Sequence, residues 1–129
     1  MVNYLTLTKE NETEILNLFQ NYISNKKSIL IVGSFDSGKT YFLNFLAKNL
    51  NLKVNHKIEI DDPLVLGRGK LPKDNIILGD ECSRYSPRNN MLKNYYNIAI
   101  IATHHENIGK EYVKYLSGDE NPVIFYMKR

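Results

Sequence analysis

The chain has 129 residues, which is enough for one domain around a single hydrophobic core and too few for two. Lysine and arginine exceed aspartate and glutamate by three, a mild basic excess that is compatible with a nucleic-acid partner without indicating one. A single cysteine, Cys82, excludes an internal disulfide framework. There is no long apolar run and no secretion signal, so we expect no membrane-spanning segment and a cytoplasmic location, in the host cytoplasm if the source is viral.

Predicted helices and strands alternate along the chain. The first helix is predicted over residues 11–24, where apolar side chains recur at helical spacing and Asn11 and Glu14 are placed as a capping box. Apolar or alternating runs predict five strands, over residues 28–32, 53–60, 75–81, 97–103 and 122–128. Further helices are predicted over residues 41–50, 86–95 and 106–116. This alternation predicts a parallel sheet covered on both faces. The strand at 53–60, whose alternating pattern indicates that only one of its faces is covered, is expected at an edge of the sheet.

The stretch GSFDSGKT, residues 33–40, fits the phosphate-loop pattern G-x-x-x-x-G-K-[ST] at every position and lies between a predicted strand and a predicted helix. Gly33 and Gly38 permit the tight turn that points backbone N–H groups at phosphates. Lys39 is expected to reach the β- and γ-phosphates, and the Thr40 hydroxyl to hold Mg²⁺. The positive end of the following helix favours the same anion. The residues predicted to bind ATP are Gly33, Ser34, Phe35, Asp36, Ser37, Gly38, Lys39, Thr40 and Tyr41.

A second motif, IILGDE, ends the strand predicted at 75–81 with two acids. A buried strand that carries carboxylates at its C-terminal tip supplies what a phosphate loop needs for hydrolysis. We predict that Asp80 holds the Mg²⁺ and that Glu81 polarises the attacking water.

The strand predicted at 97–103 ends in Thr103, and His104 and His105 follow it. Thr103 or His104 is predicted to sense the γ-phosphate or the attacking water; the alternative is that these residues cap the next helix. Because His104 and His105 are expected to point apart, we predict no transition-metal site.

A phosphate loop on the first core strand, an acidic pair on the third and a polar residue on the fourth resemble the P-loop ATPase class with an additional central strand and a catalytic glutamate. The segments ILIVGSFDSGKTYFLNFL, NIILGDECSRYSPR and IAIIATHHENI most resemble the FtsK–HerA superfamily of DNA-pumping motors, which includes viral packaging ATPases and phage assembly ATPases similar to zonula occludens toxin. That superfamily characteristically has Thr-Gln where this chain has Thr103-His104. The resemblance implies an α/β P-loop NTPase domain, a three-layer sandwich around a five-stranded, mainly parallel sheet. The helical lead-in would be 1–27 and the ATPase core 28–129.

The resemblance also implies a Mg²⁺-dependent ATP hydrolase that assembles into a homo-oligomeric ring and translocates DNA. Packaging or export of a viral or mobile-element genome is the expected task, with a portal, capsid or secretion complex as a further partner. Such motors commonly insert an arginine from one subunit into the neighbouring site. Arg84 is our candidate, and Arg68 and Arg88 are its substitutes.

Two alternatives stay open. IEIDDP at 58–63 and ATHHEN at 102–107 resemble the acidic and histidine boxes of secretion and pilus-retraction ATPases. A nucleotide-dependent switch or small kinase would need a basic lid, for which LGRGKLPK at 66–73 is the candidate. The preference for ATP over GTP is also open, because the sequence has no guanine-reading motif.

Overall fold

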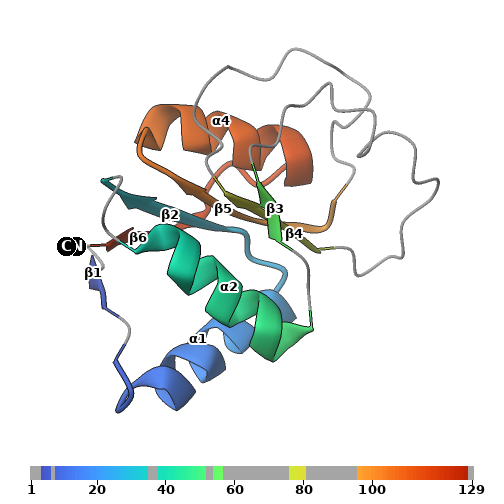
Figure 1. Ribbon diagram of the computed structural model, residues 1–129. Helices are drawn as coiled ribbons and strands as arrows, with labels where there is room; N and C mark the ends of the chain where they lie inside the picture. The colour runs from blue at the N-terminus through green and yellow to red at the C-terminus, as the bar shows by residue number, and fades with distance from the viewer. Residues whose placement is uncertain are drawn as a thin grey trace.

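The computed structural model describes residues 4–6, 8–34, 38–51, 54–56, 76–80 and 96–127, and these form three layers (Figure 1). The middle layer is a six-stranded sheet in the order β1-β6-β2-β5-β4-β3, in which every pair of neighbours is parallel. Its strands are β1 (Tyr4–Leu5), β2 (Ile29–Gly33), β3 (Val54–His56), β4 (Ile76–Asp80), β5 (Ile98–Thr103) and β6 (Val123–Met127). The helices of the described segments are α1 (Glu12–Ser24), α2 (Lys39–Leu50) and α4 (Glu106–Ser117). Helices α1 and α2 cover one face of the sheet, and α4 covers the other (Figure 1).

The predicted α/β sandwich is confirmed, and all five predicted strands are present. β5 lies between β2 and β4, which is the additional central strand that the resemblance implied. The strand expected at an edge is β3, which the structure describes over three residues. The sixth strand, β1, was not predicted; it pairs with the end of β6 through Tyr4 and Leu5. A two-residue strand is too short to show alternation in a sequence.

Both faces of the central strands are buried, which explains why their sequences are apolar throughout rather than alternating. In β2, Ile29 and Ile31 belong to the core beneath α1 and α2, whereas Leu30 belongs to the core beneath α4. Phe19 of α1 joins the first core together, because its ring centroid lies 5.3 Å from that of Phe42 in α2 and 5.3 Å from that of Phe125 in β6. The two cores fix the sheet between its helical layers.

Asn11 precedes α1 but does not form the predicted capping box with Glu14. Its side chain makes no hydrogen bond to the first turn of the helix. Instead its Oδ1 accepts a hydrogen bond from the Thr8 N–H at 2.7 Å, and its Nδ2 donates to the Thr6 carbonyl at 2.7 Å. The prediction was wrong because the preceding segment competes for the same side chain. Asn11 therefore closes the connection from β1 to α1.

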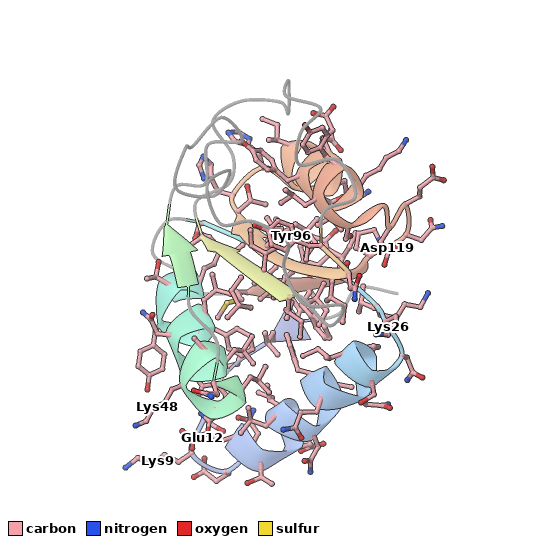
Figure 2. All side chains as sticks on the ribbon, turned by 90° about the vertical axis from the view of Figure 1, so that its right-hand side faces the viewer. Lys9, Glu12, Lys26, Lys48, Tyr96 and Asp119 are labelled. Atoms are coloured by element: carbon pink, nitrogen blue, oxygen red, sulfur yellow. The ribbon has the colours of Figure 1, made fainter. Side chains whose placement is uncertain are left out.

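The amino-terminal edge of the sheet is tied together by Ser28, which is fully buried immediately before β2. Its hydroxyl accepts a hydrogen bond from the Ala99 N–H at 3.0 Å and lies 2.8 Å from the Ser117 hydroxyl at the end of α4. Its N–H donates to Asp119 Oδ2 at 3.1 Å; Asp119, which follows α4, is labelled in Figure 2. This network joins β2, β5 and α4 at the amino-terminal edge of the sheet, and it helps to fix how far each element extends along the strand direction.

Candidate nucleotide-binding site

The loop from β2 to α2 begins at Gly33 and ends at Gly38, as the motif predicts. Gly38 has φ 89° and ψ 17°, in the left-handed region where a side chain is strained and glycine is not. Its carbonyl accepts the Phe42 N–H at 2.9 Å, so the helix starts directly after it. α2 begins at Lys39, two residues before the predicted start, which places the motif's lysine and threonine in its first turn. The first turn of a helix has unpaired N–H groups and favours an anion.

Lys39 is buried, with 6% of its surface exposed. Its ammonium group donates to the Gly33 carbonyl at 2.7 Å and to the Ser34 carbonyl at 2.5 Å. A buried ammonium is costly unless hydrogen bonds compensate for lost water, and these two carbonyls do so. These two bonds connect the first turn of α2 to the end of β2, at the start of the predicted phosphate-binding loop.

Thr40 and Asp80, the two predicted Mg²⁺ ligands, are brought into contact. The Thr40 hydroxyl donates to Asp80 Oδ2 at 2.7 Å, which links the first turn of α2 to the last residue of β4. Asp80 has only 1% of its surface exposed. A hydroxyl and a carboxylate are hard oxygen donors of the kind that Mg²⁺ prefers, and Mg²⁺ usually needs only one or two carboxylates. The donor set therefore fits the predicted ion.

Thr103 does not cap α4, whose N-cap residue is His105 and whose first turn receives no side-chain cap hydrogen bond. It is fully buried, and its hydroxyl accepts the His105 N–H at 3.0 Å. Its methyl group faces α4: a Cβ placed on Gly109 would lie 2.6 Å from Thr103 Cγ2 and 2.6 Å from Leu30 Cδ1. Gly109 was missed by the sequence analysis, because a glycine within a helical pattern does not reveal which strand lies against it.

His104 is the first residue beyond β5, and it is half-buried. Because β5 runs between β2 and β4, His104 leaves the sheet between the phosphate-loop strand and the strand that ends in Asp80. The expectation that His104 and His105 point apart is wrong: their ring centroids are 4.3 Å apart, with 46° between the planes. Strand alternation does not apply to them because β5 ends at Thr103.

A further polar contact, which the sequence analysis missed, joins the start of α4 to the end of β6. The Tyr126 hydroxyl donates to Glu106 Oε1, and Lys110 Nζ lies 3.3 Å from Glu106 Oε2. The hydrogen bond from Tyr126 and the charge of Lys110 lower the pKa of Glu106, and the carboxylate in turn raises the pKa of Tyr126. A lowered acid pKa and a raised phenol pKa both favour the folded state between about pH 5 and pH 9, and that stabilisation is lost as pH leaves this window in either direction.

Of the remaining predicted site residues, the structure describes Tyr41 and leaves most of the others outside its described segments. Tyr41 lies in the first turn of α2 with 69% of its surface exposed. Several candidates lie outside the described residues: Phe35, Asp36, Ser37, Glu81, Arg84, Arg68 and Arg88, as well as the predicted helix at 86–95. No helix in the described segments is long and apolar enough to cross a membrane.

A parallel sheet with a glycine-bounded phosphate loop after β2 and a buried acid at the tip of β4 has the fold of a P-loop NTPase. The fold is similar to that of RuvB, the Holliday junction branch migration motor of Thermotoga maritima, with a TM-score of 0.58 at 14% sequence identity. The similarity covers 95% of this chain and 46% of the RuvB chain, so this chain spans less than half of that protein. No family model and no curated protein matches the sequence.

Close packing at Gly109 decides whether a methyl group there stabilises or destabilises the protein. In an exposed helix, glycine to alanine stabilises by about 0.5–1 kcal/mol. At Gly109 the new methyl group would meet two fully buried side chains at 2.6 Å, so we expect Gly109→Ala to destabilise the protein by about 1–3 kcal/mol. Urea denaturation measures the difference, with the exposed Asn107→Ala in the same helix as the control. A more stable Gly109→Ala variant would contradict the close packing of α4 on the sheet.

Proposed function

We propose that this chain is a Mg²⁺-dependent ATPase that works as an oligomeric motor on DNA. The observation that carries the proposal is the hydrogen bond between Thr40 and Asp80, which brings two residues 40 positions apart together beside the phosphate loop. The loop sequence satisfies the full motif, and the Lys39 ammonium donates to the carbonyls of Gly33 and Ser34. The RuvB-like fold is compatible with such a motor.

In this proposal each residue of the site has a separate task. Lys39 neutralises charge on the β- and γ-phosphates, and the proposed phosphate-binding backbone extends over 33–41. Thr40 and Asp80 hold the Mg²⁺, which when bound neutralises charge on the phosphate oxygens. Glu81 takes a proton from the attacking water as its oxygen bonds to the γ-phosphorus, and the bond to the β-phosphate oxygen breaks to release ADP and phosphate.

The sensing role is assigned to His104 in this proposal. Thr103 is fully buried and its hydroxyl is bonded to the His105 backbone, so a contact with the γ-phosphate would require it to leave that position. His104 comes immediately after the strand between the loop and Asp80 and retains partial exposure.

The motor part of the proposal rests on the sequence resemblance to the FtsK–HerA motors and on the size of the chain. A domain of 129 residues cannot enclose a duplex, so translocation requires a ring of several copies. Packaging or export of a viral or mobile-element genome is the task we favour, with a portal, capsid or secretion complex as the docking partner. Arg84 is proposed to act across the subunit boundary.

The phosphate-binding role of Lys39 is tested by comparison with a lysine of the same helix. Lys39→Ala is expected to lower ATP turnover about a hundredfold or more, because it removes the cation that faces the phosphates. Lys48, labelled in Figure 2, is exposed in the last turn of α2, and Lys48→Ala should retain wild-type turnover. Phosphate release with ATP and Mg²⁺ measures both. Unchanged turnover in folded Lys39→Ala would reject the proposed ATPase.

The two adjacent acids are expected to fail in different ways. Glu81→Gln should bind ATP yet lose turnover, because an amide of nearly the same size cannot accept the proton. Asp80→Asn should chiefly weaken the response to Mg²⁺, since it removes the charge of the carboxylate that Thr40 contacts. Nucleotide binding and a Mg²⁺ titration of turnover separate the two variants. Intact Mg²⁺ dependence in Asp80→Asn, together with its loss in Glu81→Gln, would mean that the two roles are reversed.

The ring is tested by mixing two inactive variants. Arg84→Ala keeps the phosphate loop and Lys39→Ala keeps the arginine, so a mixed ring contains some interfaces with both, and partial DNA-stimulated ATPase activity should return. Mass measurement confirms mixed assembly. No recovery in confirmed mixed rings would count against Arg84 acting in trans. A strictly monomeric enzyme that ignores DNA would reject the motor, and a phosphorylated small-molecule product would favour the kinase alternative.

A further inference from the structure

The last two residues of β6, Tyr126 and Met127, contact the first turn of α4 and the phosphate loop. Successive strand residues point to opposite faces of a sheet. On the face of α2, Met127 pairs in register with Gly33, and its Cε lies 3.8 Å from the position that a Cβ on Gly38 would occupy. On the face of α4, Tyr126 pairs with Val32 and donates its hydrogen bond to Glu106. One short stretch of strand thus contacts the phosphate loop and the first turn of α4.

The turn from β5 to α4, residues 103–106, carries the proposed sensor His104. Its internal hydrogen bond is local, since the Thr103 hydroxyl accepts the His105 N–H two residues on. The bond from Tyr126 to Glu106 is different, because it connects this turn to another strand of the sheet. A hydrogen bond to an ionised carboxylate is stronger than one between neutral groups. Tyr126 is therefore a tether between the turn and β6.

Glu106 does not need Tyr126 in order to be stable at its position. A carboxylate in the first turn of a helix is favoured by the helix dipole, and Lys110 pairs with Glu106 within α4. What Tyr126 adds is a fixed relation between α4 and the strand whose end lies against the phosphate loop.

We propose that Tyr126 is a positioning residue for ATP hydrolysis: through Glu106 it holds the turn that carries His104 at a fixed place relative to the phosphate loop. The inference rests on the proposed ATPase function. It predicts that loss of the tether slows the chemical step and leaves nucleotide binding unchanged. The tether joins Tyr126 to Glu106, whereas Lys39 donates to the Gly33 carbonyl and Thr40 donates to Asp80. Misplacing a group near the reacting atoms lowers the rate even when substrate still binds.

Steady-state ATP hydrolysis by Tyr126→Phe tests the inference. We expect kcat to fall about five- to tenfold, as for the loss of one charge-assisted hydrogen bond, with KM within about twofold of the wild type. The matched control is Tyr22→Phe, because Tyr22 packs on Phe125 from the opposite face of β6. That variant should keep wild-type kcat and KM.

The partner residue supplies a rescue that a merely structural role would not show. Glu106→Gln keeps a side-chain oxygen that can accept the Tyr126 hydrogen bond and should lie closer to wild type, whereas Glu106→Ala should match Tyr126→Phe. The double variant Tyr126→Phe/Glu106→Ala should be no slower than the slower single variant, since both substitutions remove the same hydrogen bond between Tyr126 and Glu106. If Tyr126→Phe fails to fold, the two Glu106 variants decide alone. A raised KM with unchanged kcat, or fully additive losses, would overturn the inference.

Two further measurements separate failure of this inference from failure of the proposed function. Hydrogen exchange of the amides at 104–109, with and without a non-hydrolysable ATP analogue and Mg²⁺, should show nucleotide-dependent protection in the wild type and a smaller effect in Tyr126→Phe. A wild type that neither binds nor hydrolyses ATP rejects the ATPase proposal. A wild type whose turnover depends on Lys39, beside a Tyr126→Phe variant indistinguishable from Tyr22→Phe, rejects the tether alone.

Discussion

The hydrogen bond from Thr40 to Asp80 is the contact on which the candidate site depends. It requires that α2 begin directly after the phosphate loop and that β4 end at the same edge of the sheet as β2, with β5 between them. Parallel strands satisfy this condition because their carboxyl ends share one edge, where ligands of open α/β sheets bind. A hydrogen bond to a charged group contributes about 1.5–3 kcal/mol, and the nearly complete burial of Asp80 makes its loss costly.

The opposite edge of the sheet has a different character. There Ser28, Ser117 and Asp119 form hydrogen bonds with one another and with the backbone, and these contacts hold the strands together. The carboxyl edge instead carries a buried ammonium and a buried carboxylate. The hydrogen bonds that join the strands to α4 thus lie at the amino-terminal edge of the sheet. The two buried charged groups lie at the carboxyl edge. This separation leaves the two buried charges at the carboxyl edge of a sheet whose strands are held together at the other edge.

Local patterns predicted what depends on local chemistry. The buried strands appeared as apolar runs, and the phosphate loop was recognised because its glycines, lysine and threonine must occur at fixed spacing. The predictions failed where a distant or competing group decides the outcome. Asn11 bonds the preceding segment rather than capping α1, and His104 lies beside His105 once the strand ends. The contact of Tyr126 with Glu106 spans 20 residues and two elements, so no periodicity reveals it.

The charge balance at the carboxyl edge bears on whether one chain is enough for catalysis. In the part of the chain that the structure describes, the carboxyl edge carries a buried ammonium, Lys39, and a buried carboxylate, Asp80, whose charge opposes that of a nucleotide. A triphosphate carries several negative charges, and more charge moves to the leaving oxygen during phosphoryl transfer. Mg²⁺ and the N–H groups of α2 compensate part of it. In the proposed reaction the remainder calls for another cation near the γ-phosphate, for which Arg84 of a neighbouring subunit is the proposed source.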